Sequence, residues 1–162
     1  MSSTSSAQEP KGVTATLSFA PVSPDDLGAF IALERKCGDR KLYGTPLEVV
    51  LALREILNNN LYFIWRAGIV VGMAAYRRRP DGSVYISHVA IDPTCRRQGI
   101  GHAAMSFLLE KSKNAKRIDL VTHPDNQPAL QLYSSLGFGV ESRRENYFGD
   151  GEPRLVLALA LS

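Results

Sequence analysis

A glycine-rich turn between a strand-like run and a helix-like run is the feature that most constrains the fold of this chain. Residues 95–103 read Cys-Arg-Arg-Gln-Gly-Ile-Gly-His-Ala. A strand-like run, Val84 to Ile91, precedes them, and a helix-like run, Ala103 to Lys111, follows. A strand, a tight turn and a helix in this order place free backbone N–H groups at a positively polarised helix N-terminus. The segment therefore predicts a binding site for pyrophosphate or another anion.

Taken alone, the glycine turn leaves two interpretations open. Its spacing, Arg96-x-x-Gly99-x-Gly101, differs from the Rossmann dinucleotide pattern, and no Lys-Ser/Thr pair follows it as a P-loop requires. It is either an anion cradle or a turn that only begins a helix. Residues elsewhere in the chain have to decide between the two.

Length and composition indicate one globular domain. Of the 162 residues, 44% are hydrophobic and 22% are charged, close to globular averages. We expect a Ser-rich disordered tail over residues 1–12 and a single domain over residues 13–162. The 19 Lys and Arg residues exceed the 16 Asp and Glu residues, giving a net charge of +3. This charge suits an anionic ligand and is too small to indicate a nucleic-acid partner.

The apolar stretches and the cysteines predict a cytoplasmic protein. No stretch is long enough to span a bilayer, and the first residues have no signal-peptide pattern. Cys37 and Cys95 are far apart and lack zinc-ligand spacing, so we expect free thiols and no metal site. The basic run Arg77-Arg78-Arg79 precedes a turn at Pro80-Asp81-Gly82 and is expected at a solvated hairpin end.

The hydrophobic periodicity predicts a mixed α/β (α+β) order of elements. Three β-rich runs joined by short glycine turns predict an antiparallel meander in the centre of the chain. The predicted strands are 15–20, 61–66, 69–77, 83–91, 117–122, 138–143 and 154–161. Predicted helices begin after Ser23-Pro24 and at Thr45-Pro46, run over 103–111, and run over 128–136 before Gly137.

A second group of residues favours the anion-cradle interpretation. Asn126, Ala129 and Tyr133 are spaced i, i+3 and i+7 and share one helical stripe. The small Ala129 would let a ligand lie against this helix. A Tyr facing such a ligand can give its phenolic proton to a departing thiolate, because their pKa values are similar, near ~10. The alternative is that Tyr133 is an ordinary core residue of an amphipathic helix.

These residues together resemble a known family. Arg96-x-x-Gly99-x-Gly101-x-Ala103, followed by Asn126-x-x-Ala129-x-x-Leu132-Tyr133-x-x-x-Gly137-Phe138, is similar to the two signature segments of the GNAT acyl-CoA N-acetyltransferases. The run Val89-Ala90-Ile91-Asp92-Pro93 resembles the fourth strand of that family. The resemblance covers roughly residues 62–161.

The resemblance implies a fold, a cosubstrate and a direct reaction. The fold would be a mixed, mostly antiparallel sheet of six or seven strands flanked by about four helices, with acetyl-CoA between the fourth and fifth strands. Backbone groups of Val89 and Ile91 would bind the pantetheine arm, and Tyr133 would protonate the leaving thiolate. The cosubstrate-binding set that it implies is Val89, Ala90, Ile91, Arg96, Arg97, Gln98, Gly99, Ile100, Gly101, His102, Ala103, Asn126, Ala129 and Tyr133.

The general base is the least determined part of the expected site. Side chains alternate along the predicted strand, so Tyr85 and Ser87 occupy the positions where relatives often carry a base. His88 has the opposite parity and would reach the cleft only through a β-bulge. We therefore expect a water relayed by Ser87 and Tyr85 to remove the amine proton, with His88 as the alternative.

The acceptor is a primary amine whose identity stays open. Residues 143–152 resemble the late hairpin of bacterial protein N-terminal acetyltransferases, including those of ribosomal-protein alanine, and place Tyr147 at the acceptor wall. Those enzymes usually carry a Glu base where this chain has Val121, which favours a small-molecule amine over a protein N-terminus or a protein lysine. Glu34 and Tyr43 are the other candidate acceptor contacts. The sequence leaves a homodimer open, and an acyl-CoA-binding sensor without turnover is the alternative of another class.

Overall fold

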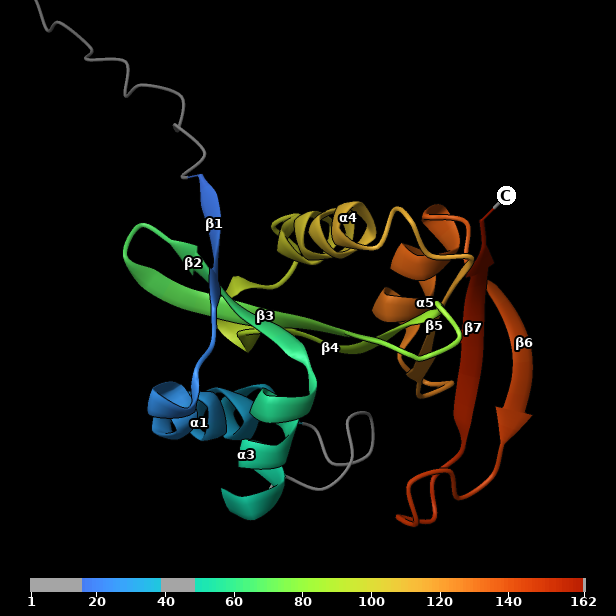
Figure 1. Ribbon diagram of the computed structural model, residues 1–162, viewed down its shortest axis with the longest axis horizontal. Coiled ribbons are helices and arrows are strands. Elements are labelled where there is room, and N and C mark those ends of the chain that lie inside the picture. Colours follow the sequence, from blue (N-terminus) through green and yellow to red (C-terminus); the bar gives the residue numbers. More distant parts are fainter. Residues whose placement is uncertain (1–15, 39–48, 162) are drawn as a thin grey trace, which may run out of the picture.

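The computed structural model describes residues 16–38 and 49–161, which form a seven-stranded sheet with helices on both faces (Figure 1). The strand order is β1-β2-β3-β4-β5-β7-β6. All neighbours are antiparallel except β4 and β5, which are parallel. The predicted tail, residues 1–12, and the predicted helix start at Thr45 lie outside the described residues. The mixed, mostly antiparallel sheet agrees with the predicted fold class.

The element boundaries follow the predicted order. The strands are β1 (Leu17–Pro21), β2 (Asn60–Arg66), β3 (Ile69–Arg78), β4 (Val84–Ile91), β5 (Arg117–Thr122), β6 (Gly139–Arg144) and β7 (Arg154–Ala160). The helices are α1 (Leu27–Cys37), α3 (Val49–Asn58), α4 (Ile100–Lys111) and α5 (Gln127–Ser135), with short 3-10 turns η1 (Pro24–Asp26) and η2 (Pro93–Cys95). None of the described helices is long and apolar enough to cross a membrane.

Helices α1 and α3 cover one face of the N-terminal half of the sheet (Figure 1). Ser23 begins this layer with a capping box, in which its backbone N–H donates to Asp26 Oδ2 at 2.8 Å. Phe30 and Leu33 of α1 and Ile56 of α3 are buried against β2 and β3. Burial of these side chains fixes the position of α1 and α3 over the sheet.

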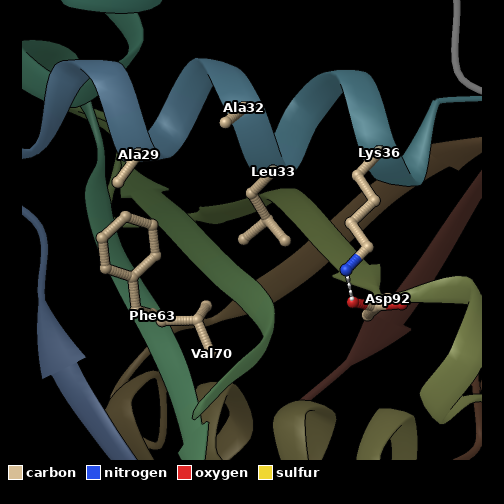
Figure 2. Close-up of a pocket in the computed structure, with 7 residues that line it drawn as sticks. All are labelled: Ala29, Ala32, Leu33, Lys36, Phe63, Val70 and Asp92. Carbon is tan, nitrogen blue, oxygen red and sulfur yellow. Dashed lines mark ion pairs between the residues drawn. The ribbon is translucent and has the colours of Figure 1, made fainter.

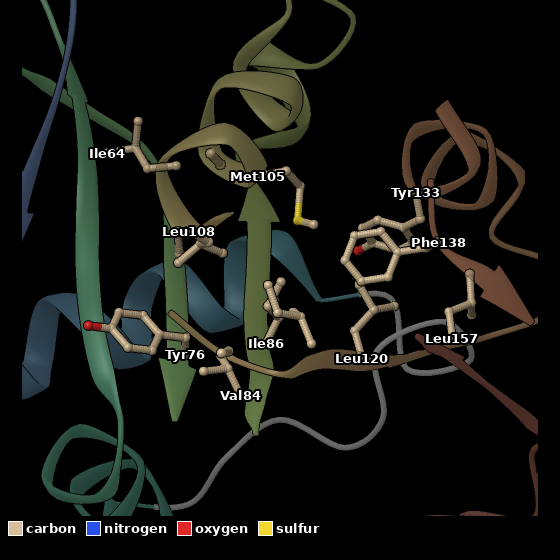
Figure 3. Close-up of a cluster of buried hydrophobic side chains, with 14 of the residues drawn as sticks. Ile64, Tyr76, Val84, Ile86, Met105, Leu108, Leu120, Tyr133, Phe138 and Leu157 are labelled. Atoms are coloured by element: carbon tan, nitrogen blue, oxygen red, sulfur yellow. The ribbon is translucent and has the colours of Figure 1, made fainter. Parts of the chain in front are cut away.

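Helices α4 and α5 cover the opposite face with the larger core. Met105 and Leu108 of α4 pack with Ile86 and Leu120, which lie on the neighbouring strands β4 and β5 (Figure 3). Tyr133 of α5 joins the same cluster. The core therefore holds α4 and α5 on either side of the line where β4 meets β5.

Strands β4 and β5 are paired over only three residues. Val84, Tyr85 and Ile86 pair with Ile118, Asp119 and Leu120. From Ser87 onward β4 has no strand partner on that side among the described residues, although it continues to Ile91. The pairing ends at a β-bulge, because Ala75 pairs with His88 while Tyr76 pairs with Ile86. A bulge bends and twists its strand, which accounts for the separation of β4 from β5 beyond Ile86.

Helix α4 begins three residues earlier than predicted. Its first residue is Ile100, and Gly99 is the N-cap with φ of 78°. A left-handed φ is open to glycine at little cost, so the helix can start directly after Gly99. The glycine turn and the helix N-terminus are therefore one structural unit.

Candidate active site

A cleft of about 1000 Å³ opens where β4 separates from β5. Its walls come from β4, β5, the turn before α4, helix α5, helices α1 and α3, and the β6–β7 hairpin. Helices α4 and α5 contribute residues at one end of this cleft, and α1 and α3 contribute residues at the other end.

The unpaired part of β4 presents backbone groups to the cleft. Asp92 N–H donates to the Val71 carbonyl on β3 at 2.8 Å, so alternate residues on β4 bond toward β3. By this alternation the N–H and C=O groups of Val89 and Ile91 face away from β3, toward the gap. Ala90 bonds toward β3 and packs its side chain against the α1–α3 cluster. An extended chain could therefore add to β4 here as a further strand would.

The turn before α4 offers main-chain donors to the same gap. The first helical hydrogen bond runs from Ala103 N–H to the Gly99 carbonyl at 3.1 Å. The N–H groups of Ile100, Gly101 and His102 thus have no helical acceptor. A Cβ at Gly101 would lie 3.4 Å from the Leu132 side chain, so a larger residue here would also crowd α5.

The start of the turn is tied to helix α1. Asp92 Oδ1 accepts hydrogen bonds from the N–H and hydroxyl of Thr94 at 2.9 and 2.8 Å. Its other oxygen lies 2.6 Å from Lys36 Nζ of α1 (Figure 2). The Lys36 ammonium and the two Thr94 donors hold the pKa of Asp92 at about 2. This carboxylate is therefore ionised at neutral pH and fixes the turn relative to α1.

The side chains of Arg96 and Gln98 in the turn bond to different parts of the protein. Arg96 donates to the carbonyls of Ile91 at 3.4 Å and Cys37 at 3.5 Å, so its side chain lies between β4 and the end of α1. Gln98 accepts a hydrogen bond from Arg66 on β2. The Gln98 side chain thus faces β2 rather than the cleft, which leaves only its backbone for a ligand.

The predicted stripe on α5 lines the other side of the gap. Asn126 and Tyr133 are both buried, and both border the cleft together with Ala129. The Asn126 side chain does not cap the helix that follows it. Tyr133 also belongs to the hydrophobic core, with its ring 6.1 Å from that of Phe138. Tyr133 is therefore both a core residue of its helix and a residue that borders the cleft.

The bulge at Ser87 turns His88 toward helices α1 and α3. Strand alternation predicted the wrong parity for His88 on this face unless a bulge was present, and the structure contains that bulge. The imidazole Nε2 lies 3.6 Å from Glu34 on α1, and Nδ1 lies 4.0 Å from Glu55 on α3. Burial raises the pKa of Glu34, an effect that His88 opposes and Glu55 reinforces. The hydroxyl of Ser87 is buried without a hydrogen-bond partner among the described residues.

Tyr85 lies beside two arginines in the same part of the cleft. The guanidinium groups of Arg77 and Arg79 lie 5.4 and 5.3 Å from its ring centre. Burial raises the pKa of Tyr85 to about 12, so it is a phenol at neutral pH and not a base. The prediction that residues 77–79 form a solvated hairpin end is wrong for Arg79, which makes two hydrogen bonds to the buried Asp119. The short turn at 80–82 brings Arg79 back over the sheet.

The β6–β7 hairpin closes the remaining wall. Tyr147 and Phe148 border the cleft and contact each other edge to face, with ring centres 4.7 Å apart. Arg154 is buried, pairs with Asp150 at 2.8 Å and lies 5.1 Å from the centre of the Phe148 ring. His123 at the end of β5 bonds Glu152 at 2.8 Å. These polar contacts hold the hairpin against the end of β5.

The structure brings most of the predicted site residues together. All predicted residues within the described ranges line the cleft except Gln98 and Ala103, and Tyr43 lies outside those ranges. Sequence reasoning missed Glu55, Arg77 and Phe148. Counting outward from the turn at 80–82 pairs Arg77 with Tyr85 and could have placed Arg77. Glu55 meets His88 only through the packing of α3 on the sheet, which no local pattern encodes.

A family model described as "Acetyltransferase (GNAT) family" matches residues 29–138. The chain belongs to the GNAT acetyltransferase family. It is 34% identical over 80 residues to the [ribosomal protein bS18]-alanine N-acetyltransferase of Escherichia coli, covering 46% of this chain and 54% of that enzyme. It is 31% identical over 80 residues to an N-alpha-acetyltransferase of Sulfurisphaera tokodaii, covering 48% of each. The chain thus spans about half the length of these relatives.

Solved structures of this family share the fold. The ribosomal-protein-S18-alanine N-acetyltransferase of Escherichia coli superposes with a TM-score of 0.75 at 22% identity, covering 91% of this chain and 95% of that one. A Bacillus subtilis acetyltransferase in complex with CoA superposes with a TM-score of 0.71 at 17% identity, covering 91% and 99%. Within the described ranges of this GNAT protein, no group of three or more His, Cys, Asp or Glu side chains is arranged to hold a metal ion.

Proposed function

We propose that this GNAT protein transfers an acetyl group from acetyl-CoA to a primary amine. The observation that carries the proposal is the separation of β4 from β5 directly beside the N-terminus of α4. An extended thioester arm can pair with Val89 and Ile91 while its pyrophosphate lies at the N–H groups of residues 100–102. Membership of the family and the CoA complex of a structural neighbour support the same cosubstrate.

The residues around this gap fit such a ligand. Gly99 turns the chain and has no side chain that could cover the N–H groups. The space around its Cβ position is open, because none of the described atoms lies within 4 Å of it. Asn126 and Ala129 leave polar and small surface opposite the turn. The positive end of the α4 dipole and the exposed Arg97 favour a phosphate here. Acetyl-CoA supplies the activated acetyl group as a thioester.

The proposed mechanism is a direct displacement. The acceptor nitrogen forms a bond to the acetyl carbon, the carbon–sulfur bond breaks, and the leaving thiolate takes a proton from the Tyr133 hydroxyl. Before the attack, the acceptor ammonium loses one proton to a water that the buried Ser87 hydroxyl binds at the bulge. The second proton, released from the nitrogen after the attack, restores the Tyr133 hydroxyl through water. Tyr85, which stays protonated, supports this water as a hydrogen-bond partner and does not itself remove the proton.

Two acceptor classes enter from the α1–α3 side. A small-molecule amine is favoured by Val121, because protein N-terminal acetyltransferases with a similar late hairpin usually carry a Glu at this position. A peptide N-terminus is favoured by the names of the relatives, which act on an alanine N-terminus or an α-amine. Tyr147 and Phe148 would form the wall of the acceptor site in either case.

The test is release of free CoA thiol from acetyl-CoA across a panel of amines. The panel contains polyamines, amino acids, amino-acid amides, and peptides with free or blocked N-termini. Thiol release with at least one free amine and none with its N-blocked form supports the proposal. Coenzyme binding without thiol release on every free amine would instead indicate the sensor function.

A further inference from the structure

Three titratable side chains from three elements converge at the α1–α3 end of the cleft. They are Glu34 of α1, Glu55 of α3 and His88 of β4, and all three line the cleft. The imidazole lies between the two carboxylates, 3.6 Å from Glu34 and 4.0 Å from Glu55. Both distances exceed that of a hydrogen bond. His88 Nδ1 is fully buried and has no hydrogen-bond partner within the described part of the chain.

The arrangement carries an excess of negative charge in a partly buried place. Glu34 is only 20% exposed, so its charge is poorly screened by water. Lys36 pairs with Asp92, and Arg79 pairs with Asp119. Arg77, which also lines the cleft, lies against the Tyr85 ring. The raised pKa of Glu34 shows that its ionised form lacks full compensation in the free protein.

One of the two carboxylates is held in position by its own helix end. The Asn59 side-chain amide donates to Glu55 Oε2 at 2.9 Å and to the Glu55 carbonyl at 2.8 Å. These bonds hold the Glu55 oxygens near the imidazole, although His88 does not contact them directly. A positioned carboxylate that stops short of its neighbour leaves acceptor capacity for a third group.

We propose that Glu34, Glu55 and His88 form the binding site for the acceptor's ammonium group and make the enzyme select amines without a neighbouring negative charge. An ammonium group has three N–H donors, which match the two carboxylates and His88 Nε2, the imidazole nitrogen on the Glu34 side. An acceptor with a carboxylate beside its amine would be repelled by the same two glutamates. This inference rests on the proposed function, since it assigns the substrate class of the same cleft.

The selectivity can be measured with matched acceptors that differ only in charge. Alanine amide and alanine share one amine, and only alanine carries an adjacent carboxylate. We expect kcat/KM for alanine amide to exceed that for alanine by about tenfold or more in the wild-type enzyme. Dipeptides that begin with alanine and continue with Lys or Asp extend the same comparison to peptides.

The glutamates are then tested by Glu34→Gln, Glu55→Gln and the double variant. Each single substitution removes a charge-assisted hydrogen bond, which raises the KM for alanine amide about tenfold. Each substitution leaves the KM for acetyl-CoA unchanged and reduces the ratio of kcat/KM for alanine amide to that for alanine. The matched control is Glu110→Gln, because Glu110 is 72% exposed on α4 and pairs with Lys113 on the surface.

A further measurement separates a binding role from a structural one. Because burial disfavours the Glu34 charge, Glu34→Gln should leave the melting temperature at pH 7 unchanged or raise it. A glutamate that served only the fold would lower it. Titration calorimetry of alanine amide into the protein saturated with CoA reports binding without turnover.

The outcomes are distinguishable from those of the proposed function. Loss of amide binding in the glutamate variants, with CoA binding retained, supports the inference even for a wild-type protein that releases no thiol. Wild-type turnover with equal KM values in Glu34→Gln, Glu55→Gln and Glu110→Gln overturns the inference and leaves the transferase proposal standing. No binding of alanine amide or of the Ala-Lys dipeptide to the wild-type complex with CoA also overturns it.

Discussion

At the scale of single residues, Tyr133 carries the proposed acid step. Tyr133→Phe keeps the ring in the core beside Phe138 and removes the hydroxyl from the cleft. We expect kcat to fall by about 100-fold, a typical loss for a general acid, while the Kd for CoA stays the same. Single-turnover rates and CoA titration measure the two effects. Tyr62→Phe on β2, which packs against Phe107, is the control, and an unchanged kcat for Tyr133→Phe would refute the acid role.

Gly72 on β3 is a second residue whose position tolerates no side chain. The local sequence does not predict this, because the crowding comes from the neighbouring strand β4. A Cβ at this position would lie 2.6 Å from the Ala90 carbonyl oxygen and 3.3 Å from Ile91 Cα. Gly72→Ala must therefore displace the end of β4. We expect a loss of about 1–3 kcal/mol in stability together with weaker CoA binding, because Val89 and Ile91 move.

The control for Gly72→Ala is Gly28→Ala on α1, where no atom lies within 4 Å of the added methyl group. That change should leave CoA binding intact and stabilise the helix by up to about 1 kcal/mol. Chemical denaturation and CoA titration of both variants provide the comparison. Normal CoA affinity in Gly72→Ala would show that the end of β4 does not position the cosubstrate.

At the scale of elements, local patterns predicted what local physics decides. Strand β5 has the predicted bounds, Arg117–Thr122, because a short β-rich run lies between polar turns. Ser23 and Pro24 predicted the start of the first helical segment, because an N-cap serine and a proline at the first helical position act locally. The bulge at Ser87 was left as an alternative, because it depends on how β4 packs between β3 and the helices. The meeting of Glu55 with His88 is likewise a tertiary contact between distant segments.

The 3-10 turn η2 is the element that joins α1 to the turn before α4, and its cap gives it a defined pH response. The lowered pKa of Asp92 means that its contribution to stability is present above the ordinary pKa, near 3.8, and is lost as the pH falls through about 2. Asp92→Ala removes both the cap and the ion pair, and we expect it to cost about 1 kcal/mol at pH 7 for the cap alone.

The matched variants for this element are Asp92→Asn and Lys36→Met. Asp92→Asn keeps an oxygen for the Thr94 donors and loses the ion pair, so it should be more stable than Asp92→Ala. The difference in unfolding free energy between wild type and Asp92→Asn should shrink as the pH is lowered from 4 to 2. A difference that is independent of pH, or that persists in the Lys36→Met background, would contradict the ion-pair account.

At the scale of the whole molecule, the sheet consists of two halves joined by one short parallel contact. Strands β1 to β4 and strands β5 to β7 meet only through the three residue pairs between Val84–Ile86 and Ile118–Leu120. Motif spacing predicted both sides of the site, the turn before α4 and the stripe on α5. Their separation across the sheet was implied only by resemblance, since register and twist are set by the assembled sheet.

A ligand held between the two halves should therefore stabilise both of them together. With CoA at about 100 times its Kd, linkage adds about 2.7 kcal/mol, which corresponds to roughly 5–10 °C in melting temperature for a chain of this size. Amide hydrogen exchange should slow at residues 87–91 and 97–102 on one side and near Asn126 and Tyr133 on the other. Exchange in β1 and β2, which do not line the cleft, is the internal control. Slowing confined to one half would place CoA on one wall only and contradict a site formed by the separation of β4 from β5.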